Sequence, residues 1–297
     1  MIVKNGRASV ILYIILLMIG TGLLLYPTLS NYYNTFHQSK AITQYAEITK
    51  ELSAEEIEAL TKDAKEYNKA LITDNTRWKM TDEERKVYNN ILDISGTGVM
   101  GYIEIPKVNI SLPIYHGTSD GVLQIAVGHL EGSSLPVGGP NTHCVLSGHR
   151  GLPSADLFTH LDRLNLHDVF TINVLDKVLV YEVDQIKIVV PGDTQYLQIE
   201  DGKDYCTLLT CTPYGINTHR LLVRGKRVAA SEDGKDLYVY PDAYKMDAKT
   251  VAVIMAIPLT ILILIGMAVH TIRKRRRNKE ISKIIEENEL KKETENN

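Results

Sequence analysis

The sequence has 297 residues, of which 44% are hydrophobic, and a formal net charge of −3 from 33 basic and 36 acidic side chains. This length allows one globular domain with additional segments. The near-neutral charge, without a basic stripe interleaved with aromatic residues in the central region, gives no reason to expect a nucleic-acid partner. The hydrophobic residues are concentrated in two runs, one near each end of the chain.

The first hydrophobic run predicts a membrane anchor. Ala8 to Tyr26 contains no charged residue and is long enough for a helix to cross about 30 Å of hydrocarbon. Lys4 and Arg7 precede it, which predicts that residues 1–7 stay in the cytoplasm. A cleaved signal peptide is the alternative, but the run exceeds the usual length of about 7–15 apolar residues and no Ala-x-Ala site follows it.

A helical region is predicted for residues 27–98. Two Ser/Thr-x-x-Glu sequences have the spacing of capping boxes, and apolar residues follow each at helical intervals. These boxes are Ser53-x-x-Glu56 and Thr81-x-x-Glu84. The pattern indicates amphipathic helices packed on a core. The link between them, 73–80, holds the only tryptophan of the chain, Trp78.

From Met100 onward the pattern predicts β structure, because short apolar or alternating runs are separated by Gly, Pro, Asn and Asp. Ser154 to Asn165 is the one short helix expected here, with its leucines on one face. Many short strands with few helices favour a barrel or a sandwich. The predicted strands are 102–105, 110–115, 142–147, 170–174, 178–190, 205–211 and 221–228.

The second hydrophobic run, Thr250 to Ile272, predicts another membrane helix in which Pro258 can be tolerated. The basic residues that follow it directly are typical of a cytoplasmic stop-transfer signal. Both termini are therefore expected inside the cell, with the central domain and a juxtamembrane linker, 231–249, outside. The charged tail, 273–297, is expected to end as a solvated helix or a disordered segment.

The three cysteines are Cys144, Cys206 and Cys211, and an odd count leaves at least one free thiol. Cys206 and Cys211 lie about 16 Å apart on one predicted strand and on opposite faces, so they cannot form a disulfide. Cys144 and Cys206 are expected to be small core residues. No Cys/His spacing indicates zinc, and no metal or cofactor is expected.

Cys211 is the candidate reactive residue. It ends a predicted strand, and Arg220 opens the next one after a loop rich in turn residues, Pro213, Gly215 and Asn217. If the strands pair antiparallel, the two residues lie within about 5–8 Å of each other. A lone cysteine on a strand is most often a buried apolar residue, but a strand end beside a loop is where reactive sites tend to lie.

A candidate base for this thiol is His149. A cysteine of ordinary pKa, about 8.5, is only a few per cent thiolate at neutral pH, so it needs a nearby cation or base. His149 lies in a polar stretch, Ser147–Pro153, that follows an apolar run. Four other histidines of the domain lack a comparable setting: His116, His129, His143 and His160. His219 is next to Arg220 in the sequence and is expected to point away from it.

These motifs resemble those of sortases, the membrane-held cysteine transpeptidases of Gram-positive bacteria. Thr207-Leu-Leu-Thr-Cys211 is similar to the Thr-Leu-x-Thr-Cys signature. The stretch from Cys211 through Arg220 to Gly225, with Ser147–Pro153 upstream, resembles class C sortases, which polymerise pilins. The similarity covers 99–228 and includes Gly101–Pro106 and Leu112–Gly117.

The resemblance implies a mainly β fold. It implies a sortase-type eight-stranded barrel over residues 99–230, with N-terminal helices and two flanking transmembrane helices. It also implies that Cys211 attacks the Thr–Gly amide of an LPXTG-type sorting signal and forms a thioacyl intermediate. His149 would protonate the leaving amine and deprotonate the incoming one, and Arg220 would donate hydrogen bonds to the substrate carbonyl or its oxyanion.

The resemblance further implies a lid over the site at 73–80. Class C lids usually carry an Asp-Pro-aromatic motif, whereas here Asp74 is followed by Asn75 and Trp78 comes later. Asp74, Trp78 and the motif residue Thr210 are the predicted lid and substrate contacts. The competing cations Arg150 and Arg224 do not match the catalytic position of the family.

The implied partners are pilins or surface proteins with LPXTG-type sorting signals, together with the lipid bilayer. For a pilus sortase the incoming nucleophile is a lysine of the next pilin. One alternative is a sortase that attaches surface proteins to cell-wall peptide, although the second membrane segment and long helical preface favour the pilus class. Another is an inactive membrane scaffold, against which the intact Cys211, His149 and Arg220 argue.

Overall fold

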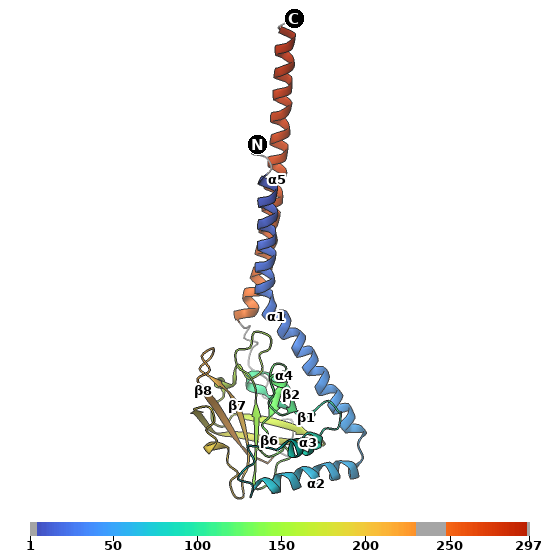
Figure 1. Ribbon diagram of the computed structural model, residues 1–297, viewed down its shortest axis with the longest axis vertical. Helices are drawn as coiled ribbons and strands as arrows, with labels where there is room; N and C mark the ends of the chain where they lie inside the picture. Colours follow the sequence, from blue (N-terminus) through green and yellow to red (C-terminus); the bar gives the residue numbers. More distant parts are fainter. Residues whose placement is uncertain (1–4, 230–247, 296–297) are drawn as a thin grey trace. The chain divides into compact units, whose positions relative to one another are not determined.

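A computed structural model describes residues 5–229 and 248–295. The chain divides into two units, one formed by Met1–Thr28 with Lys245–Asn297 and the other by Leu29–Tyr244. Figure 1 shows the secondary-structure elements of each. The predicted juxtamembrane linker, 231–249, lies outside the described residues except for its last two positions, where α5 begins.

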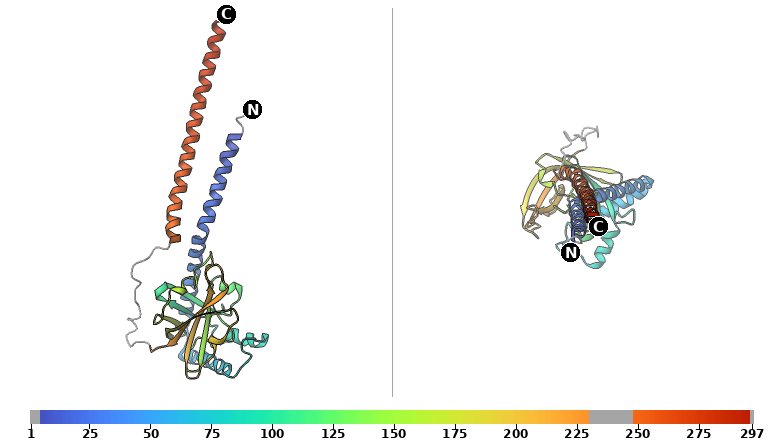
Figure 2. Two further views of the ribbon diagram at one scale, coloured as in Figure 1. Left: turned by 90° about the vertical axis from the view of Figure 1, so that its left-hand side faces the viewer. Right: turned by 90° about the horizontal axis from the view of Figure 1, so that it is seen from above.

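Eight strands form a closed barrel in the order β1-β2-β3-β4-β7-β8-β6-β5, which confirms the predicted eight-stranded barrel. Figure 2 shows the ribbon of this domain from two further directions. Neighbouring strands pair antiparallel except for β2–β3 and β4–β7, which are parallel. The strands are β1 Val99–Ile105, β2 Ile110–His116, β3 Val127–His129, β4 Thr142–Ser147, β5 Val169–Val174, β6 Lys177–Val189, β7 Asp204–Thr212 and β8 His219–Arg227.

The barrel interior is filled by alternate residues of its strands, as the period of two in the sequence predicts. On β4 and β7 the inward residues include Cys144, Leu146, Cys206 and Leu208, all buried in one core cluster. The residues between them face outward, so each strand presents a second face on which a site can be built.

Short helical segments lie in several of the connections between strands. They are η1 Pro106–Val108, α4 Asp120–Leu123, η2 Leu161–Arg163 and η3 Gln195–Leu197.

Three helices precede the barrel: α1 Asn5–Glu51, α2 Ala54–Leu71 and α3 Asp82–Asn90. Both predicted capping boxes are present, with the hydroxyls of Ser53 and Thr81 accepting from the backbone amides three residues on. The helices pack on the barrel core through buried residues such as Ala64 and Tyr88. Their caps satisfy amide groups that would otherwise lack partners at the helix ends.

The helix predicted for Ser154–Asn165 is wrong, because only the single 3-10 turn η2 forms there. The Ser154 carbonyl, which would accept the first bond of such a helix, accepts instead from Asn34 of α1. The amide of Phe158, which would donate that bond, donates to the His149 carbonyl. Leu157 also has a positive φ of 37°. The leucines are buried nevertheless, in an irregular loop.

In the described part of the chain, one helix is long and apolar enough to cross a membrane, the part of α1 from Ile11 to Glu51. It overlaps the predicted span and continues through Pro27. The second predicted span, 250–272, lies in α5, Ala248–Glu295, which is helical. Many side chains at the start of α5 are outside the described residues, and this second span stays a prediction.

Candidate active site

The predicted antiparallel pairing of β7 with β8 is confirmed, and it places Cys211 directly opposite Arg220. The loop between them, 213–218, turns the chain with positive φ angles at Gly215 and Asn217. Glycine and asparagine adopt such angles most readily. The local sequence therefore accounts for the cross-strand neighbours.

His149 follows the end of β4, which neighbours β7 on the side away from β8. The parallel register pairs Ser147 with Leu209. Hydrogen bonds between the two chains continue past the end of β4. The amide of Gly148 donates to the Leu209 carbonyl (3.1 Å), and the hydroxyl of Thr210 donates to the Gly148 carbonyl (2.7 Å). His149 therefore occupies the register position beside Cys211.

Cys211 belongs to the outer face of the barrel. Side chains alternate along a strand, so Cys211 shares a face with Leu209, whereas Leu208 before it faces the interior core. The Cys211 side chain is half-buried and is not part of a disulfide. The outer face at the end of β7 therefore leaves a thiol accessible to a substrate.

Thr210 lies on the inner side of the same strand end. It is 1% exposed, and its hydroxyl bonds the Gly148 carbonyl. It therefore braces the chain that carries His149, and its contact with a substrate stays a prediction.

Arg220 is half-exposed, and the backbone holds its guanidinium group. Its Nη1 donates to the carbonyl oxygens of Asn217 (3.2 Å) and His219 (3.1 Å). These bonds use one nitrogen of the planar fork, which has five N–H donors in all. Donors therefore remain for an incoming oxygen atom next to Cys211.

The two competing arginines are occupied by carboxylates. Arg150 forms an ion pair with Asp162 (2.5 Å). Arg224 contacts Asp184 with two nitrogens, each at 3.0 Å. Their positive charges are largely neutralised where they lie, in contrast to that of Arg220.

Cys144 and Cys206 lie side by side in the barrel interior, in register on β4 and β7. Both are buried and free of disulfides, as predicted. Burial raises the pKa of the Cys206 thiol well above its ordinary value, which suppresses the reactive thiolate. Neither can meet a substrate on the outer face.

Buried histidines elsewhere in the domain have structural hydrogen bonds. The Nε2 of His129 faces the Ser134 carbonyl, and its Nδ1 faces the Tyr88 hydroxyl. His143 bonds the Gln198 carbonyl through Nδ1 (2.8 Å) and the Thr207 hydroxyl through Nε2 (2.7 Å). Since a carbonyl only accepts, Nδ1 of His143 carries the proton and Nε2 accepts from Thr207.

Acid should destabilise the fold through His143. Burial lowers its pKa to about 4, while the unfolded chain takes up this proton near pH 6.5. The contribution of neutral His143 to the free energy of unfolding is therefore fully present above pH 6.5. It falls by up to about 3 kcal/mol as the pH drops toward 4. Urea unfolding of the detergent-solubilised chain at several pH values measures this. His143→Gln should lower stability at neutral pH and flatten its decline below pH 6.5; an unchanged pH slope would contradict the assignment.

The segment 73–80 packs on the outer face of the barrel. Trp78 joins a cluster that contains Val145 and Leu222, together with Leu209, which lies two residues before Cys211 on the same face. Gly132 allows this close approach, because a Cβ there would lie 2.1 Å from the Arg77 carbonyl oxygen. Trp78 therefore covers the face that leads to the candidate site.

Arg77 holds this segment in place, and sequence reasoning missed it. Its side chain is buried, and its Nη2 donates to the Leu197 carbonyl (3.3 Å) and to Oε1 of Gln198 (3.0 Å). Its guanidinium lies 4.4 Å from the Trp78 ring centroid. Asp74, by contrast, accepts from the amide and hydroxyl of Thr76, which lower the pKa of its carboxyl group, and these contacts form a local turn.

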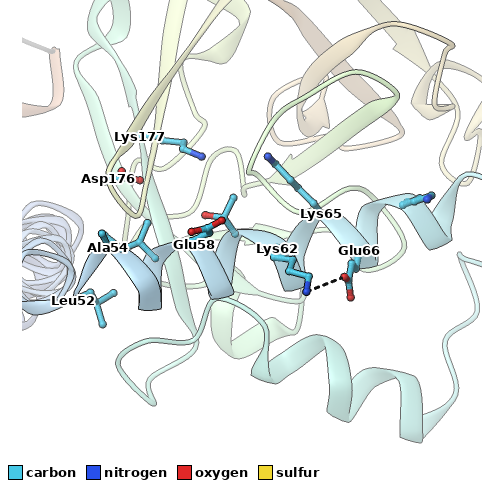
Figure 3. Close-up of a pocket in the computed structure, with 11 residues that line it drawn as sticks. Leu52, Ala54, Glu58, Lys62, Lys65, Glu66, Asp176 and Lys177 are labelled. Atoms are coloured by element: carbon cyan, nitrogen blue, oxygen red, sulfur yellow. Dashed lines mark ion pairs between the residues drawn. The ribbon is translucent and has the colours of Figure 1, made fainter.

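Two hollows lie on this domain. A groove of about 820 Å³ runs between α2 and the β5–β6 turn and is lined by charged side chains, with Lys62 and Glu66 paired (Figure 3). It carries none of the three candidate catalytic residues. A smaller hollow of about 320 Å³ is lined by Thr212 and by Pro213 and Tyr214 of the β7–β8 loop. Its lining also lacks the three candidate catalytic residues. We place the site at the end of β7 and the start of β8, because Cys211 and Arg220 pair there and the chain that leaves neighbouring β4 carries His149.

Comparison with known proteins gives the family. Residues 103–228 match the sortase domain. Sortase D of Bacillus subtilis is 34% identical over 131 residues, which is 43% of this chain and 63% of that protein. Sortase A of Streptococcus agalactiae is 31% identical over 38% of this chain and 47% of its own length. The chain thus spans less than two thirds of these relatives.

Solved structures are more similar. Sortase C1 of S. agalactiae is 54% identical, with a TM-score of 0.63, over 65% of this chain and all of the other. Sortase C of Streptococcus pneumoniae is 45% identical, with a TM-score of 0.58, over 64% of this chain and 97% of the other. The chain therefore belongs to the sortase family. Within that family, these similarities make it a class C, or pilus, sortase.

Proposed function

We propose that this chain is a membrane-anchored cysteine transpeptidase that joins pilin subunits. The observation that carries the proposal is the pairing of Cys211 with Arg220. The register of β4 with β7, continued two residues past its last pair, supports His149 as the neighbour of Cys211 on the other side. A Clostridium perfringens sortase C that has been solved with a C-terminal cell wall sorting motif is 47% identical, with a TM-score of 0.56, over 64% of this chain and 99% of the other. This similarity supports an LPXTG-type sorting signal as the substrate.

In the first half-reaction, Cys211 gives its thiol proton to His149, and the sulfur attacks the threonine carbonyl carbon of the sorting signal. The C–S bond forms, the C–N bond to glycine breaks, and His149 gives a proton to the leaving amine. In the second half-reaction, a pilin lysine amine attacks the thioester and His149 takes its proton. The new C–N bond forms as the C–S bond breaks, which returns the thiolate.

Arg220 serves both half-reactions by donating hydrogen bonds to the oxygen that becomes negative in each tetrahedral intermediate. Its attachment to two loop carbonyls fixes the fork before substrate arrives. Such preorganisation is most effective in a site from which water is excluded.

The membrane topology completes the proposal. The apolar run 8–26 would anchor the chain in the membrane with residues 1–7 in the cytoplasm. The second run, 250–272, would cross the membrane back to the cytoplasm, so that the basic tail, 273–297, lies inside the cell. The catalytic domain would then lie on the extracellular face. This arrangement suits substrates that are displayed at the cell surface.

Mass spectrometry tests the proposed chemistry. The chain is incubated with a sorting-signal peptide and a lysine-containing pilin peptide, and we expect an acyl adduct on Cys211 followed by an isopeptide-linked product. A product joined through a cell-wall peptide amine in preference to lysine would favour the cell-wall alternative. Binding of the peptide without any adduct or product would favour a non-catalytic scaffold.

The segment 73–80 would act as a lid that protects the thioester from water. Trp78→Ala and Arg77→Ala should each speed alkylation of Cys211 severalfold and raise hydrolysis relative to transpeptidation. The reason is that each removes a contact that holds the segment on the outer face. Alkylation rate and melting temperature are measured on the same variants.

Lys79→Ala, an exposed neighbour in the same segment, is the matched control and should change neither quantity. If Trp78 only packs against the barrel, its removal should leave Cys211 reactivity unchanged and reduce stability by about 3–5 kcal/mol. That combination would exclude the lid.

A further inference from the structure

The part of α1 that follows the predicted membrane span has an unusual distribution of polarity. Its polar side chains contact the barrel: Asn31 bonds Asp156, Asn34 bonds the Ser154 carbonyl and Gln38 bonds the Ile125 carbonyl. Its large apolar side chains point the other way. Leu29, Tyr32, Tyr33 and Phe36 are 63%, 75%, 62% and 61% exposed.

This is the reverse of an ordinary surface helix, which buries its apolar stripe and exposes its polar face. A group of exposed aromatic side chains on one helix face marks an interaction surface. The same helix returns to normal polarity further along, because its exposed residues from Ser39 to Glu51 are polar or charged, and it buries Tyr45. The environment of the helix therefore changes near residue 38.

The charge pattern identifies what surrounds the aromatic part. No Asp, Glu, Lys or Arg occurs between Arg7 and Lys40, although the apolar run itself ends at Tyr26. At 1.5 Å per residue, the stretch from Ile11 to Phe36 is about 39 Å long, close to the roughly 40–45 Å of a bilayer with its headgroup regions. Tyrosine side chains are enriched at membrane–water interfaces, where the ring is apolar and the hydroxyl is hydrated.

We propose that the face of α1 formed by Leu29, Tyr32, Tyr33 and Phe36 lies in the headgroup region of the lipid bilayer. This inference rests on the membrane anchoring included in the proposed function. Its occupant is lipid, because the sequence contains no charged residue from the predicted span to the end of this face and the chain is helical throughout that stretch.

The consequence concerns the active site. Asn31 and Asn34 clamp the loop 154–156 to the other face of the same helix. Two residues further on, the amide of Phe158 donates to the carbonyl of His149 (3.1 Å). The interfacial segment is thus connected through short contacts to His149.

Depth-dependent fluorescence quenching tests the inference on the full chain. Tyr33→Cys and Gln44→Cys are each made in a Cys211→Ala background, in which the remaining cysteines are buried, and are labelled with an environment-sensitive dye. Eleven residues span about three turns, so both positions lie on one helix face, and Gln44 is exposed. The chains are reconstituted into vesicles of phosphatidylcholine with phosphatidylglycerol.

We expect a nitroxide attached near the lipid headgroup to quench the dye at position 33, and aqueous iodide to quench it severalfold less than the dye at position 44. Equal quenching by iodide at both positions would overturn the proposal. Protection of position 33 in native membranes but not in these vesicles would also overturn it, because a protein would then cover the face.

Failure of the anchoring itself is a separate result. Alkaline carbonate extraction that releases the chain from the vesicles would contradict the membrane span of the proposed function. A chain that is retained but has a water-exposed label at position 33 would contradict only the interfacial contact.

Discussion

Replacing Cys211 with alanine is expected to abolish both the acyl adduct and the joined product. The thiol forms the bond on which both half-reactions depend, and the other two cysteines of the chain are buried in the barrel core. Loss of a nucleophile lowers kcat on the order of a million-fold in well-studied hydrolases. A coupled assay that follows release of the glycine-containing fragment and formation of the isopeptide product measures both steps.

Cys206→Ala and Cys144→Ala are the matched controls, because these thiols lie on β7 and its neighbour β4 but face the barrel interior. Each removes one buried sulfur, so each should reduce stability while most activity remains. Activity as low in Cys206→Ala as in Cys211→Ala, at a temperature where both variants are folded, would refute the assignment of the nucleophile.

Local signals in the sequence predicted most of the strands and the Cys211–Arg220 pair, whereas the choice of an eight-stranded barrel over a sandwich came from the resemblance to sortases. Alternation of apolar residues determines which side chains face inward, and the turn residues between Cys211 and Arg220 determine the pairing of their strands. The position of His149 on the other side of Cys211 depends on the parallel pairing of β4 with β7. Strands that are far apart in sequence form such a pair, and only the family motif indicated it.

Long-range contacts explain what the sequence did not predict. Ser154–Asn165 has helical spacing, but Asn31 and Asn34 bind its backbone from more than a hundred positions away. Arg77 looks like an ordinary loop arginine, and its burial depends on acceptors at Leu197 and Gln198. Nothing near either segment in the sequence carries that information.

The polarity of α1 is a similar case. Asn31, Asn34 and Gln38 look like solvent-facing residues in the sequence, yet they contact the barrel while the aromatic residues between them are exposed. A periodic pattern shows that a helix has two faces, but the partner of each face is decided by the rest of the fold and by the lipid or water outside it. The sequence therefore predicted a helical region here, but it did not predict the orientation of this helix.

Arg220→Lys is expected to lower kcat/KM at least about tenfold, equivalent to about 1.4 kcal/mol, and Arg220→Ala about 10²–10³-fold. Lysine keeps the positive charge but cannot bond two loop carbonyls while it also presents further planar donors to the oxyanion. The loss should therefore appear mainly in kcat, because the oxyanion exists only in the transition state and the intermediates.

Arg224→Lys is the matched control for this prediction. Arg224 lies further along β8 on the same face of the strand, since side chains alternate, and its guanidinium is engaged by Asp184 and Glu200. Its replacement should weaken that ion pair and lower the melting temperature without a comparable loss of kcat. Kinetics of Arg220→Lys equal to those of the unmodified chain would show that Arg220 supplies only general positive potential, and a loss confined to KM would assign it to substrate binding in the ground state.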